Sequence, residues 1–271
     1  MTRIVLLSDL HFGAHDPALI GPLLSAVRAQ APDVTVVAGD FAQRGTTGQW
    51  RQARDFVAAL PDPVFCVPGN HDIPHFNPLL RAIDPYGRYR RATGSAEEPV
   101  WSDADTLVAG INTADRWQWM RGKVSPPHVD GLRQRLGDAG GRLRIAVMHH
   151  PLEHAAVTVD PLMRGAGMLL GALPGMGARI VLSGHIHVSH VAPFRDAPGI
   201  LFVQNGTSLS TRRRGEANVF LTLVTGPGTV RITRHYAAGD GFVATAPEDW
   251  AHDGAEWQPE AAPARRLQLP R

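Results

Sequence analysis

The chain has 271 residues, and its 27 Lys and Arg residues barely exceed its 25 Asp and Glu residues, which argues against nucleic acid as a partner. A single cysteine excludes an intramolecular disulfide and a zinc site built from cysteines, so any metal ion must use His, Asp, Glu or Asn. The apolar run before Asp9 is too short for a signal peptide, and no apolar stretch reaches membrane-spanning length, so we expect a cytoplasmic protein with no membrane partner.

The first half of the chain alternates apolar runs of strand length with segments of helical character, a pattern typical of an α/β sheet protein. Buried strands are predicted at Ile4–Leu7, Val34–Ala38, Val64–Val67, Leu107–Ile111, Ile145–Met148 and Ile180–Leu182. Helices are predicted at Pro17–Gln30, Gly48–Leu60, Pro126–Leu136 and Pro161–Leu173. Three of these helices begin with proline, whose missing N–H costs little in a first turn.

After Gly184 the helical pattern fades. Further strands are predicted at Val188–Phe194, Ile200–Gln204, Val219–Val224 and Thr229–Tyr236. A run of strands that closes an α/β protein suggests a second, mixed sheet packed on the first. We therefore expect a four-layer α-β-β-α sandwich, in which two mixed sheets pack face to face, helices flank them and the site lies at one rim.

The last part of the chain, residues 246–271, differs in composition from the rest. Pro, Ala, Glu and Arg dominate it, and Trp250 and Trp257 are its largest apolar residues. This composition predicts a domain of residues 1–245 followed by an extended C-terminal tail that is pinned by its tryptophans.

Polar motifs follow five of the predicted strands, each at the carboxyl end of the strand. They are Asp9-x-His11, Gly39-Asp40, Gly69-Asn70-His71-Asp72, His149-His150 and Gly184-His185-x-His187. Because loops at that end of an open α/β sheet converge, these residues can share one pocket. Carboxylates, an amide oxygen and imidazoles are ligands of borderline divalent metals such as Mn, Fe(II), Zn or Co. Each motif alone is more often a turn or a surface pair, so their number and order carry the prediction.

The spacing within the motifs suggests how the ligands are aimed. A glycine directly precedes three of the proposed ligands, where the chain leaves a strand and a positive φ is expected: Gly39, Gly69 and Gly184. Asp9 and His11 are two residues apart, as are His185 and His187. In extended backbone such residues point to the same side, so each pair could approach a metal ion together.

This ordered set of motifs, from residue 9 to residue 187, resembles that of the calcineurin-like metallophosphoesterases. The stretches Leu7-Ser8-Asp9-Leu10-His11-Phe12-Gly13 and Val67-Pro68-Gly69-Asn70-His71-Asp72 look like the bacterial cyclic-nucleotide phosphodiesterase (class III) branch. The resemblance implies a metal-dependent phosphoesterase that hydrolyses phosphodiesters, including 3',5'-cyclic nucleotides, by attack of a hydroxide that bridges two metal ions. Phe41-Ala42 stands where many relatives carry Leu-Thr, but neither position holds a ligand.

The same resemblance implies two divalent or mixed-valence transition-metal ions (Mn, Fe, Zn or Co) and assigns their ligands. One ion would take Asp9, His11 and His187, the other Asn70, His149 and His185, and Asp40 would bridge them. His71 would be the catalytic residue, facing the substrate and stabilising or protonating the leaving oxygen. Asn70 would also contact the substrate.

Two polar residues near the motifs have open roles. We prefer His149 to His150 as a ligand because it comes first after the strand, and neighbours on an extended chain point opposite ways. Whether His150 supports a ligand or faces the substrate stays open. Asn112 also ends a predicted strand and is a weak candidate for substrate binding, although a turn explains it equally well.

Two basic clusters and one apolar stripe have both an ordinary and a functional interpretation. Residues 88–91 and 212–214 are first interpreted as solvated loops, with a pocket rim that attracts an anionic substrate as the alternative. Trp117, Trp119 and Met120 could cap the pocket or form a dimer contact, but such residues more often belong to the core.

Three functions compete. The leading one is a phosphodiesterase that acts on a small phosphoester. A phosphomonoesterase or nuclease of the same superfamily is the second, and the lack of an evident DNA-binding module weighs against the nuclease. A non-catalytic metal-binding interaction module is the third, and the intact ligand set argues against it. A homo-oligomer is left open.

Overall fold

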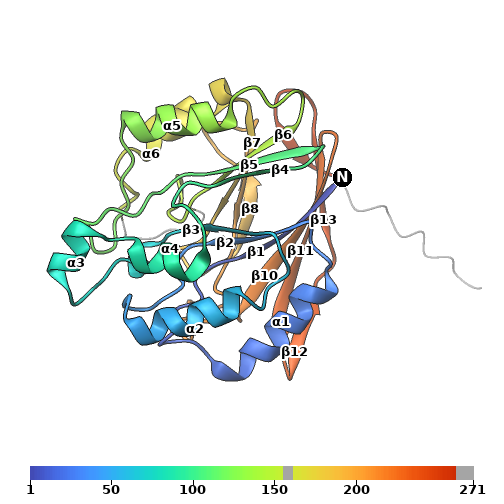
Figure 1. Ribbon diagram of the computed structural model, residues 1–271. Helices are drawn as coiled ribbons and strands as arrows, with labels where there is room; N and C mark the ends of the chain where they lie inside the picture. The colour runs from blue at the N-terminus through green and yellow to red at the C-terminus, as the bar shows by residue number, and fades with distance from the viewer. Residues whose placement is uncertain (155–160, 261–271) are drawn as a thin grey trace, which may run out of the picture.

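Two β-sheets form the centre of the computed structural model, which describes residues 1–154 and 161–260 (Figure 1). The strands of the first sheet are β1 (Thr2–Leu7), β2 (Val34–Ala38), β3 (Val64–Val67), β10 (Val219–Gly226), β11 (Thr229–Ala238), β12 (Gly241–Ala244), β13 (Glu248–His252) and β14 (Trp257–Pro259). Those of the second are β4 (Val100–Ser102), β5 (Thr106–Gly110), β6 (Leu143–Val147), β7 (Ala178–Ser183), β8 (His190–Pro193) and β9 (Leu201–Gln204). The α-helices are α1 (Ile20–Ala29), α2 (Thr47–Val57), α3 (Pro78–Ile83), α4 (Gly87–Thr93), α5 (Pro126–Leu136) and α6 (Ala166–Ala172). Short 3₁₀ helices are η1 (Pro17–Leu19), η2 (Asn70–Asp72) and η3 (Pro174–Met176).

Both sheets are mixed. The first has the order β14-β13-β11-β10-β1-β2-β3, with β12 paired to β11, and its parallel pairs are β1 with β2 and β2 with β3. The second has the order β4-β5-β6-β7-β9-β8, with β5, β6, β7 and β9 parallel and an antiparallel strand at each edge. Inner parallel strands are covered on both faces, as β2 shows with all five of its residues buried.

Apolar side chains fill the space between the sheets. Leu6 and Val36 of the first sheet and Val147 and Leu182 of the second belong to one buried cluster. The outer face of the first sheet packs against α1, α2 and α4, and that of the second sheet packs against α5 and α6. Figure 1 shows these two groups of helices on opposite sides of the sheets. The predicted four-layer sandwich is therefore confirmed.

Helix starts follow local capping signals in the sequence. At α2, Thr46 and Gln49 form a capping box, in which each side chain accepts a hydrogen bond from the other's backbone N–H at 3.4 Å. The predicted helix at Pro161–Leu173 begins only at Ala166, because Gly165 has a φ of 82° and cannot continue a right-handed helix. Helices α3 and α4 are not predicted from the sequence, since six and seven residues are too few to display a helical period.

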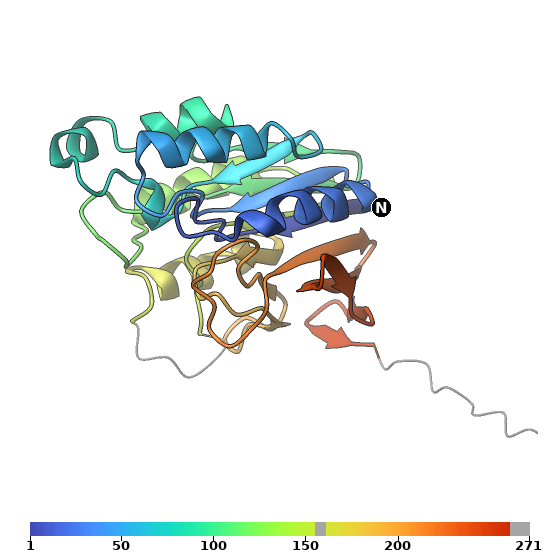
Figure 2. The same cartoon turned by 90° about the horizontal axis from the view of Figure 1, so that it is seen from below.

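The strands that close the chain do not form a sheet of their own, and this part of the prediction is wrong. Strands β8 and β9 extend the second sheet, whereas β10 to β14 extend the first. Strand β10 pairs with β1 over five residue pairs, from Thr2 opposite Thr225 to Leu6 opposite Leu221. Figure 2 shows the orange part of the chain beside its blue start. Pairing with β10 covers an edge of β1 that would otherwise expose unpaired backbone groups.

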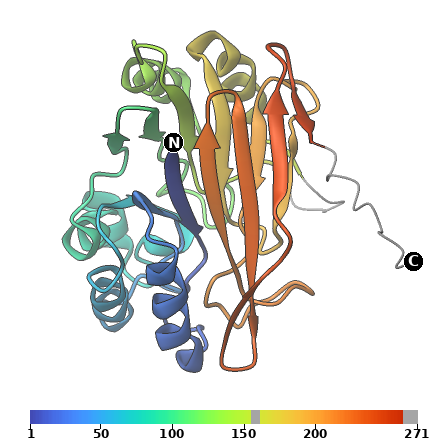
Figure 3. The ribbon, with the colours of Figure 1, turned by 90° about the vertical axis from the view of Figure 1, so that its right-hand side faces the viewer.

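The predicted extended tail from residue 246 is also wrong for residues 248–259. Strand β13 pairs with β11 and β14 pairs with β13, so the first sheet continues past residue 245 (Figure 3). Trp250 and Trp257 are buried in the cluster between the sheets, and the indole N–H of Trp257 donates to Arg179 O at 2.9 Å. The tryptophans thus hold this segment as expected, but as paired strands. Residues 261–271 lie outside the described part of the chain.

None of the helices in the described ranges has the length and apolar character needed to cross a lipid bilayer.

Candidate metal centre

The seven predicted metal ligands lie at one rim of the sandwich, where strands of both sheets end. Asp9 and His11 follow β1, Asp40 follows β2, Asn70 follows β3, His149 follows β6, and His185 and His187 follow β7. All are buried except His185, which is partly exposed. The backbone N–H of His185 donates to Asp9 Oδ2 at 2.9 Å, which joins the end of a strand in one sheet to the end of a strand in the other.

One group of three ligands surrounds a single point. His11 Nε2 lies 3.1 Å from His187 Nε2 and 3.6 Å from Asp9 Oδ1. His187 Nε2 lies 3.2 Å from the same carboxylate oxygen. Three donor atoms from two sheets therefore meet within ordinary contact distance.

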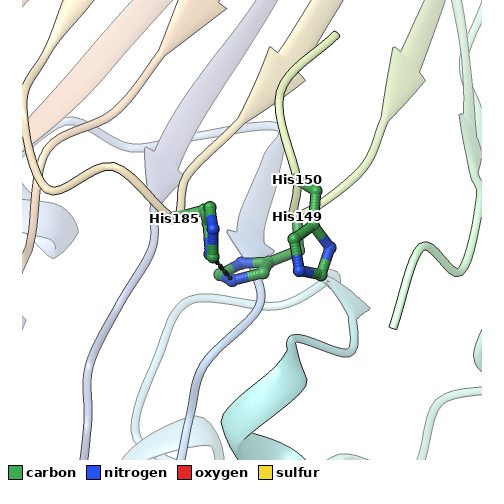
Figure 4. Close-up of side chains that lie close together, drawn as sticks. All are labelled: His149, His150 and His185. Carbon is green, nitrogen blue, oxygen red and sulfur yellow. Dashed lines mark hydrogen bonds between the residues drawn. The ribbon is translucent and has the colours of Figure 1, made fainter. Parts of the chain in front are cut away.

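Asp40 connects this group to a second one. Its Oδ2 lies 3.5 Å from His11 Nε2 and 3.3 Å from His149 Nε2. His149 Nε2 in turn lies 3.2 Å from His185 Nδ1, the contact drawn as a dashed line in Figure 4. One carboxylate thus stands between two imidazole groups.

The residues present fit a metal ion. Asp9 Oδ1 and Asn70 Oδ1 are buried and have no hydrogen-bond partner among the described residues. Buried polar atoms normally have a partner, so these two oxygens call for a ligand. Asn70 Nδ2 is fixed by donating to Trp119 O at 3.1 Å, which leaves the oxygen as the free end of the amide. Carboxylate, amide and imidazole donors suit borderline divalent metals.

The ligands themselves carry backbone strain. In the described ranges, five of the six non-glycine residues with positive φ are predicted ligands: Asp9 (53°), His11 (49°), Asp40 (57°), His185 (79°) and His187 (61°). Such backbone costs about 1–3 kcal/mol per residue and clusters at functional sites. The extended backbone that we expected at these pairs is therefore wrong. Asp9 and His11 still reach the same point, while His185 and His187 turn to different groups.

The three glycines before the ligands serve two different needs. Gly39 has a φ of 87°, as predicted. Gly69 and Gly184 do not have positive φ, so that prediction is wrong for them. A Cβ atom at Gly69 would lie 2.5 Å from Asp40 N, and one at Gly184 would lie 2.5 Å from Asp9 Oδ2. Glycine is required at both positions because neighbouring chain passes too close for a side chain.

Backbone carbonyls orient two of the imidazoles. His149 Nδ1 lies 2.8 Å from Ala38 O, and His187 Nδ1 lies 2.5 Å from Arg212 O. A ring that donates Nδ1–H to a carbonyl presents Nε2 as its free lone pair, which fixes the tautomer needed for metal binding.

Asp72 is a supporting residue to which the sequence assigns no role. Its buried carboxylate accepts hydrogen bonds from the backbone N–H groups of Asp40, Ala42 and Gly69 at 2.8 to 3.0 Å. It therefore joins the loop after β2 to the loop after β3. Burial and the nearby Asp40 raise the pKa of Asp72 to about 8. Its position in the same motif as Asn70 was the available signal, but the motif alone does not tell support from ligation.

Nearby imidazoles keep the carboxylates of Asp9 and Asp40 ionised. Burial alone would raise the pKa of Asp9, but the imidazoles of His187 and His11 hold it well below its usual value. Burial acts the same way on Asp40, and His149 and His71 hold its pKa low. Both side chains are therefore anionic donors at neutral pH.

The imidazoles of the second group differ from each other. Burial lowers the pKa of His185 to about 3, and His149 acts in the same direction, so His185 is a neutral donor. Burial would lower the pKa of His149 too, but the adjacent Asp40 raises it to about 9. A metal ion bound by His149 would accordingly displace a proton.

A cleft of about 560 Å³ opens beside the cluster. Its walls include Asp40, Asn70, His185 and His187, with His71 and Arg212 next to them. His71 Nδ1 lies 2.7 Å from Gln43 O and its Nε2 lies 3.2 Å from Arg212 Nη1. The backbone N–H of His71 donates to Asp40 Oδ1 at 2.9 Å. The residue predicted to be catalytic therefore lies directly beside the carboxylate that joins the two groups of predicted ligands.

The two basic clusters have different surroundings. Arg212, Arg213 and Arg214 all line this cleft, in agreement with the pocket-rim alternative. In α4, Arg90 pairs with Asp84 and Glu97, and Arg88 donates to Gly45 O. The α4 cluster thus has a structural explanation and does not line this cleft, but it belongs to a helix, so the predicted solvated loop is wrong for residues 88–91.

His150 and Asn112 support loops. His150 lies beside His149 and His185 in Figure 4, but its Nδ1 is 2.8 Å from Thr113 Oγ1 and its Nε2 is 3.1 Å from Met120 O. Both ring nitrogens therefore hold residues 113–120 in place. Asn112 Oδ1 accepts from Ala114 N–H at 2.9 Å, which is the turn alternative, and Asn112 is absent from the walls of the cleft.

The apolar stripe is exposed, so its interpretation as core is wrong. Trp117, Trp119 and Met120 are 68%, 55% and 60% exposed. Met120 lines the cleft beside the cluster, and a second cleft of about 850 Å³ is lined by both Trp119 and Met120.

This fold and this rim of carboxylates and imidazoles define a class of α/β sandwich proteins whose strand ends carry side chains that could hold metal ions. A family model described as calcineurin-like phosphoesterase matches residues 2–189, and the chain belongs to this family.

Relatives within the family have phosphodiesterase names. The chain is 26% identical over 201 residues to a "Probable cyclic nucleotide phosphodiesterase" of Synechococcus sp., covering 69% of this chain and 74% of that protein. It is 27% identical over 213 residues to the glycerophosphodiester phosphodiesterase GpdQ of Enterobacter lignolyticus, covering 70% and 73%. It is also 27% identical over 208 residues to the 3',5'-cyclic adenosine monophosphate phosphodiesterase CpdA of Escherichia coli, covering 68% and 69%.

Solved structures share the fold at low identity. The purple acid phosphatase PPD1 of yellow lupin matches with a TM-score of 0.67 and 13% identity, covering 89% of this chain and 52% of that one, so this chain spans about half its length. Vacuolar Protein Sorting 29 of Cryptosporidium parvum matches with a TM-score of 0.52 and 14% identity, covering 92% and 98%. At such identities the similarity establishes the fold and nothing about activity.

Proposed function

We propose that the chain is a phosphodiesterase that uses two transition-metal ions. The observation that carries the proposal is the position of Asp40, whose Oδ2 lies within 3.5 Å of imidazoles from both ligand groups. One ion would be held by Asp9, His11 and His187, the other by Asn70, His149 and His185, with Asp40 shared between them. Mn, Fe, Zn and Co all suit these donors.

A two-metal centre of this kind supplies Lewis acidity and lowers the pKa of bound water. Residues that line the cleft would bind the substrate and assist the reaction. Arg212 brings a positive charge to the place where a phosphodiester would lie, which favours the anion and the charge that develops on its oxygens. His71 faces the same space and is the proposed catalytic residue, which stabilises or protonates the departing oxygen. Asn70 would serve as a ligand and contact the substrate as well.

The names of the relatives suggest two substrate classes, cyclic nucleotides and glycerophosphodiesters. We propose small phosphodiesters, 3',5'-cyclic nucleotides included, as substrates of this chain. The cytoplasmic location expected from the sequence stays a prediction, and so does a homo-oligomer.

The test begins with chelated protein reloaded with Mn, Zn, Co or Fe(II). Turnover is then compared on 3',5'-cyclic AMP, bis-p-nitrophenyl phosphate, p-nitrophenyl phosphate and single-stranded DNA. We expect up to two ions per chain, activity that requires them, and a preference for diesters. Asp40→Asn should lose metal and activity, whereas Asp240→Asn, an exposed control with the same change of charge, should lose neither.

Full turnover without detectable metal would overturn the metal requirement. A preference for the monoester or for DNA would move the chain to another activity of the same superfamily. Metal-loaded protein that hydrolyses none of the four compounds would support an interaction module.

A further inference from the structure

Two clefts meet at His71. The first is lined by four of the proposed metal ligands, and the second, of about 850 Å³, is lined by Gln43, His75 and Trp119 among others. Both clefts include His71, Met120 and Arg212 in their walls. A substituent on a phosphorus atom held at the cluster can therefore extend past His71 into the second cleft.

The second cleft has an aromatic wall made of Trp119 and His75. Their ring centroids are 4.4 Å apart, with an angle of 66° between the ring planes. More than half of the Trp119 surface is exposed, and this residue lines the cleft. Large exposed indoles beside a polar cleft are suited to pack against planar groups of a ligand.

Arg81 packs against the indole of Trp119. The guanidinium carbon of Arg81 lies 4.4 Å from the centroid of the Trp119 ring. The same buried side chain donates to Arg116 O at 2.5 Å, to Gln118 O at 2.6 Å and to Pro74 O at 3.3 Å. A buried arginine thus joins α3 to the loop that carries the indole, and the wall exists before any ligand binds.

The aromatic wall is also connected to the proposed metal ligands. Asn70 Nδ2 donates to Trp119 O, and His150 Nε2 lies 3.1 Å from Met120 O. A direct hydrogen bond therefore joins the proposed ligand Asn70 to the backbone of the residue that carries the indole. A planar substituent in the second cleft and a phosphoryl group at the cluster can be bound at the same time.

We infer that Trp119, with His75, selects phosphodiesters that carry a planar aromatic substituent, that is, nucleosides in preference to glycerol-type groups. This inference rests on the proposed phosphodiesterase function. Contact between a base and an aromatic side chain contributes about 1–3 kcal/mol, whereas glycerol is too small and polar to gain from such a wall. Gln43, Gln49 and Arg44 lie in the same cleft and offer polar groups to the edge of a base.

The experiment compares Trp119→Ala, Trp119→Phe and Trp117→Ala on two diesters, 3',5'-cyclic AMP and glycerophosphoethanolamine. Trp117 is the matched control, since it lies in the same loop, is 68% exposed and lines neither cleft. Each variant is compared with the wild type on the same substrate. The Trp119→Ala change should lower kcat/KM for cyclic AMP about 5- to 150-fold, mainly through KM, and change it less than about twofold for glycerophosphoethanolamine. Trp119→Phe should keep most of the activity, and Trp117→Ala all of it.

An equal loss on both diesters, or no loss on cyclic AMP, would overturn the inference. A second measurement separates its failure from that of the proposed function. Binding of AMP to the metal-loaded protein is titrated calorimetrically, and Trp119→Ala should weaken it by a similar factor. If the wild type hydrolyses neither diester, the proposed function fails while the AMP titration still decides whether the wall binds a nucleoside.

Discussion

Replacing Gly69 by alanine tests whether close packing of two loops forms the metal centre. A new Cβ atom at this position would lie 2.5 Å from Asp40 N and 2.8 Å from Asp40 Cγ, with Oδ1 nearer still. The backbone atom cannot move alone, because Asp40 N–H donates to Asp72 Oδ2 at 3.0 Å. The side chain can move, but only by leaving the two imidazoles that it now joins.

The magnitude follows from these contacts. Forcing an extra methyl group into a packed region costs about 1–3 kcal/mol, and for a chain of this size about 1 kcal/mol shifts Tm by roughly 2–4 °C. We therefore expect Gly69→Ala to lower Tm by about 2–12 °C. Displacement of the Asp40 carboxylate should also weaken metal binding by about 10- to 100-fold, the usual effect of disturbing the support of a ligand.

Thermal melting of chelated protein and calorimetric titration with Mn²⁺ measure the two effects separately. Gly48→Ala is the control, because a Cβ atom there meets nothing within 4 Å and the position lies in α2. This change should leave metal binding intact and keep or slightly raise Tm, since alanine favours helices. If Gly69→Ala melts and binds Mn²⁺ as the wild type does, the two loops are not packed as described.

Two further predictions concern the catalytic residue and the C-terminal strands. His71→Ala should keep both metal ions and lose roughly 10² to 10⁴ in turnover of an alkyl diester, with a smaller loss on a nitrophenyl ester that needs little protonation. Kinetics on both esters and metal analysis check this prediction, and loss of a metal ion would refute the catalytic role of His71. Trp257→Ala should lower the free energy of unfolding by about 3–5 kcal/mol in urea titrations, because the indole is 2% exposed and donates to Arg179 O. An unchanged urea midpoint would mean that residues 248–259 do not pack in the sheet.

The layered fold could be predicted because its signals are local. The strand at Val34–Ala38 is apolar except for Thr35, and α2 begins at a capping box, so both elements follow from short stretches of sequence. The gathering of the motif residues at one rim could be predicted for a similar reason, since each motif ends a strand. What these local patterns lack is pairing information. Strand β10 pairs with β11, which directly follows it, and also with β1, more than 200 residues away in sequence. Nothing within β10 specifies this distant partner.

The residues that hold the site's loops in place could not be identified from the sequence either. Asp72 and His150 stand in the same motifs as ligands, and only their hydrogen bonds show that one joins two loops and the other holds the segment up to Met120. The exposure of the aromatic residues was also not predicted. Large aromatic side chains normally belong to a core, whereas Trp119 contacts Arg81 and His75 and is still 55% exposed. Such roles depend on contacts between distant segments.

The strained ligands explain why the loops must hold one another. A strand that ends at the rim has to turn within a residue or two to aim a side chain back across the sheet edge, and glycine cannot occupy a position that must supply a donor atom. Asp9, His11 and Asp40 therefore take left-handed backbone themselves. Their loops are fixed by hydrogen bonds from Asp9 N–H to Gly39 O at 3.0 Å and from His11 N–H to Asp40 O at 2.9 Å. The loop after β1 is thus held by the loop after β2, and Asp72 holds the latter to the loop after β3. Because each strained turn depends on its neighbour, the donor atoms are arranged by the protein itself, and the proposed metal ions would enter a site whose geometry the fold already stabilises.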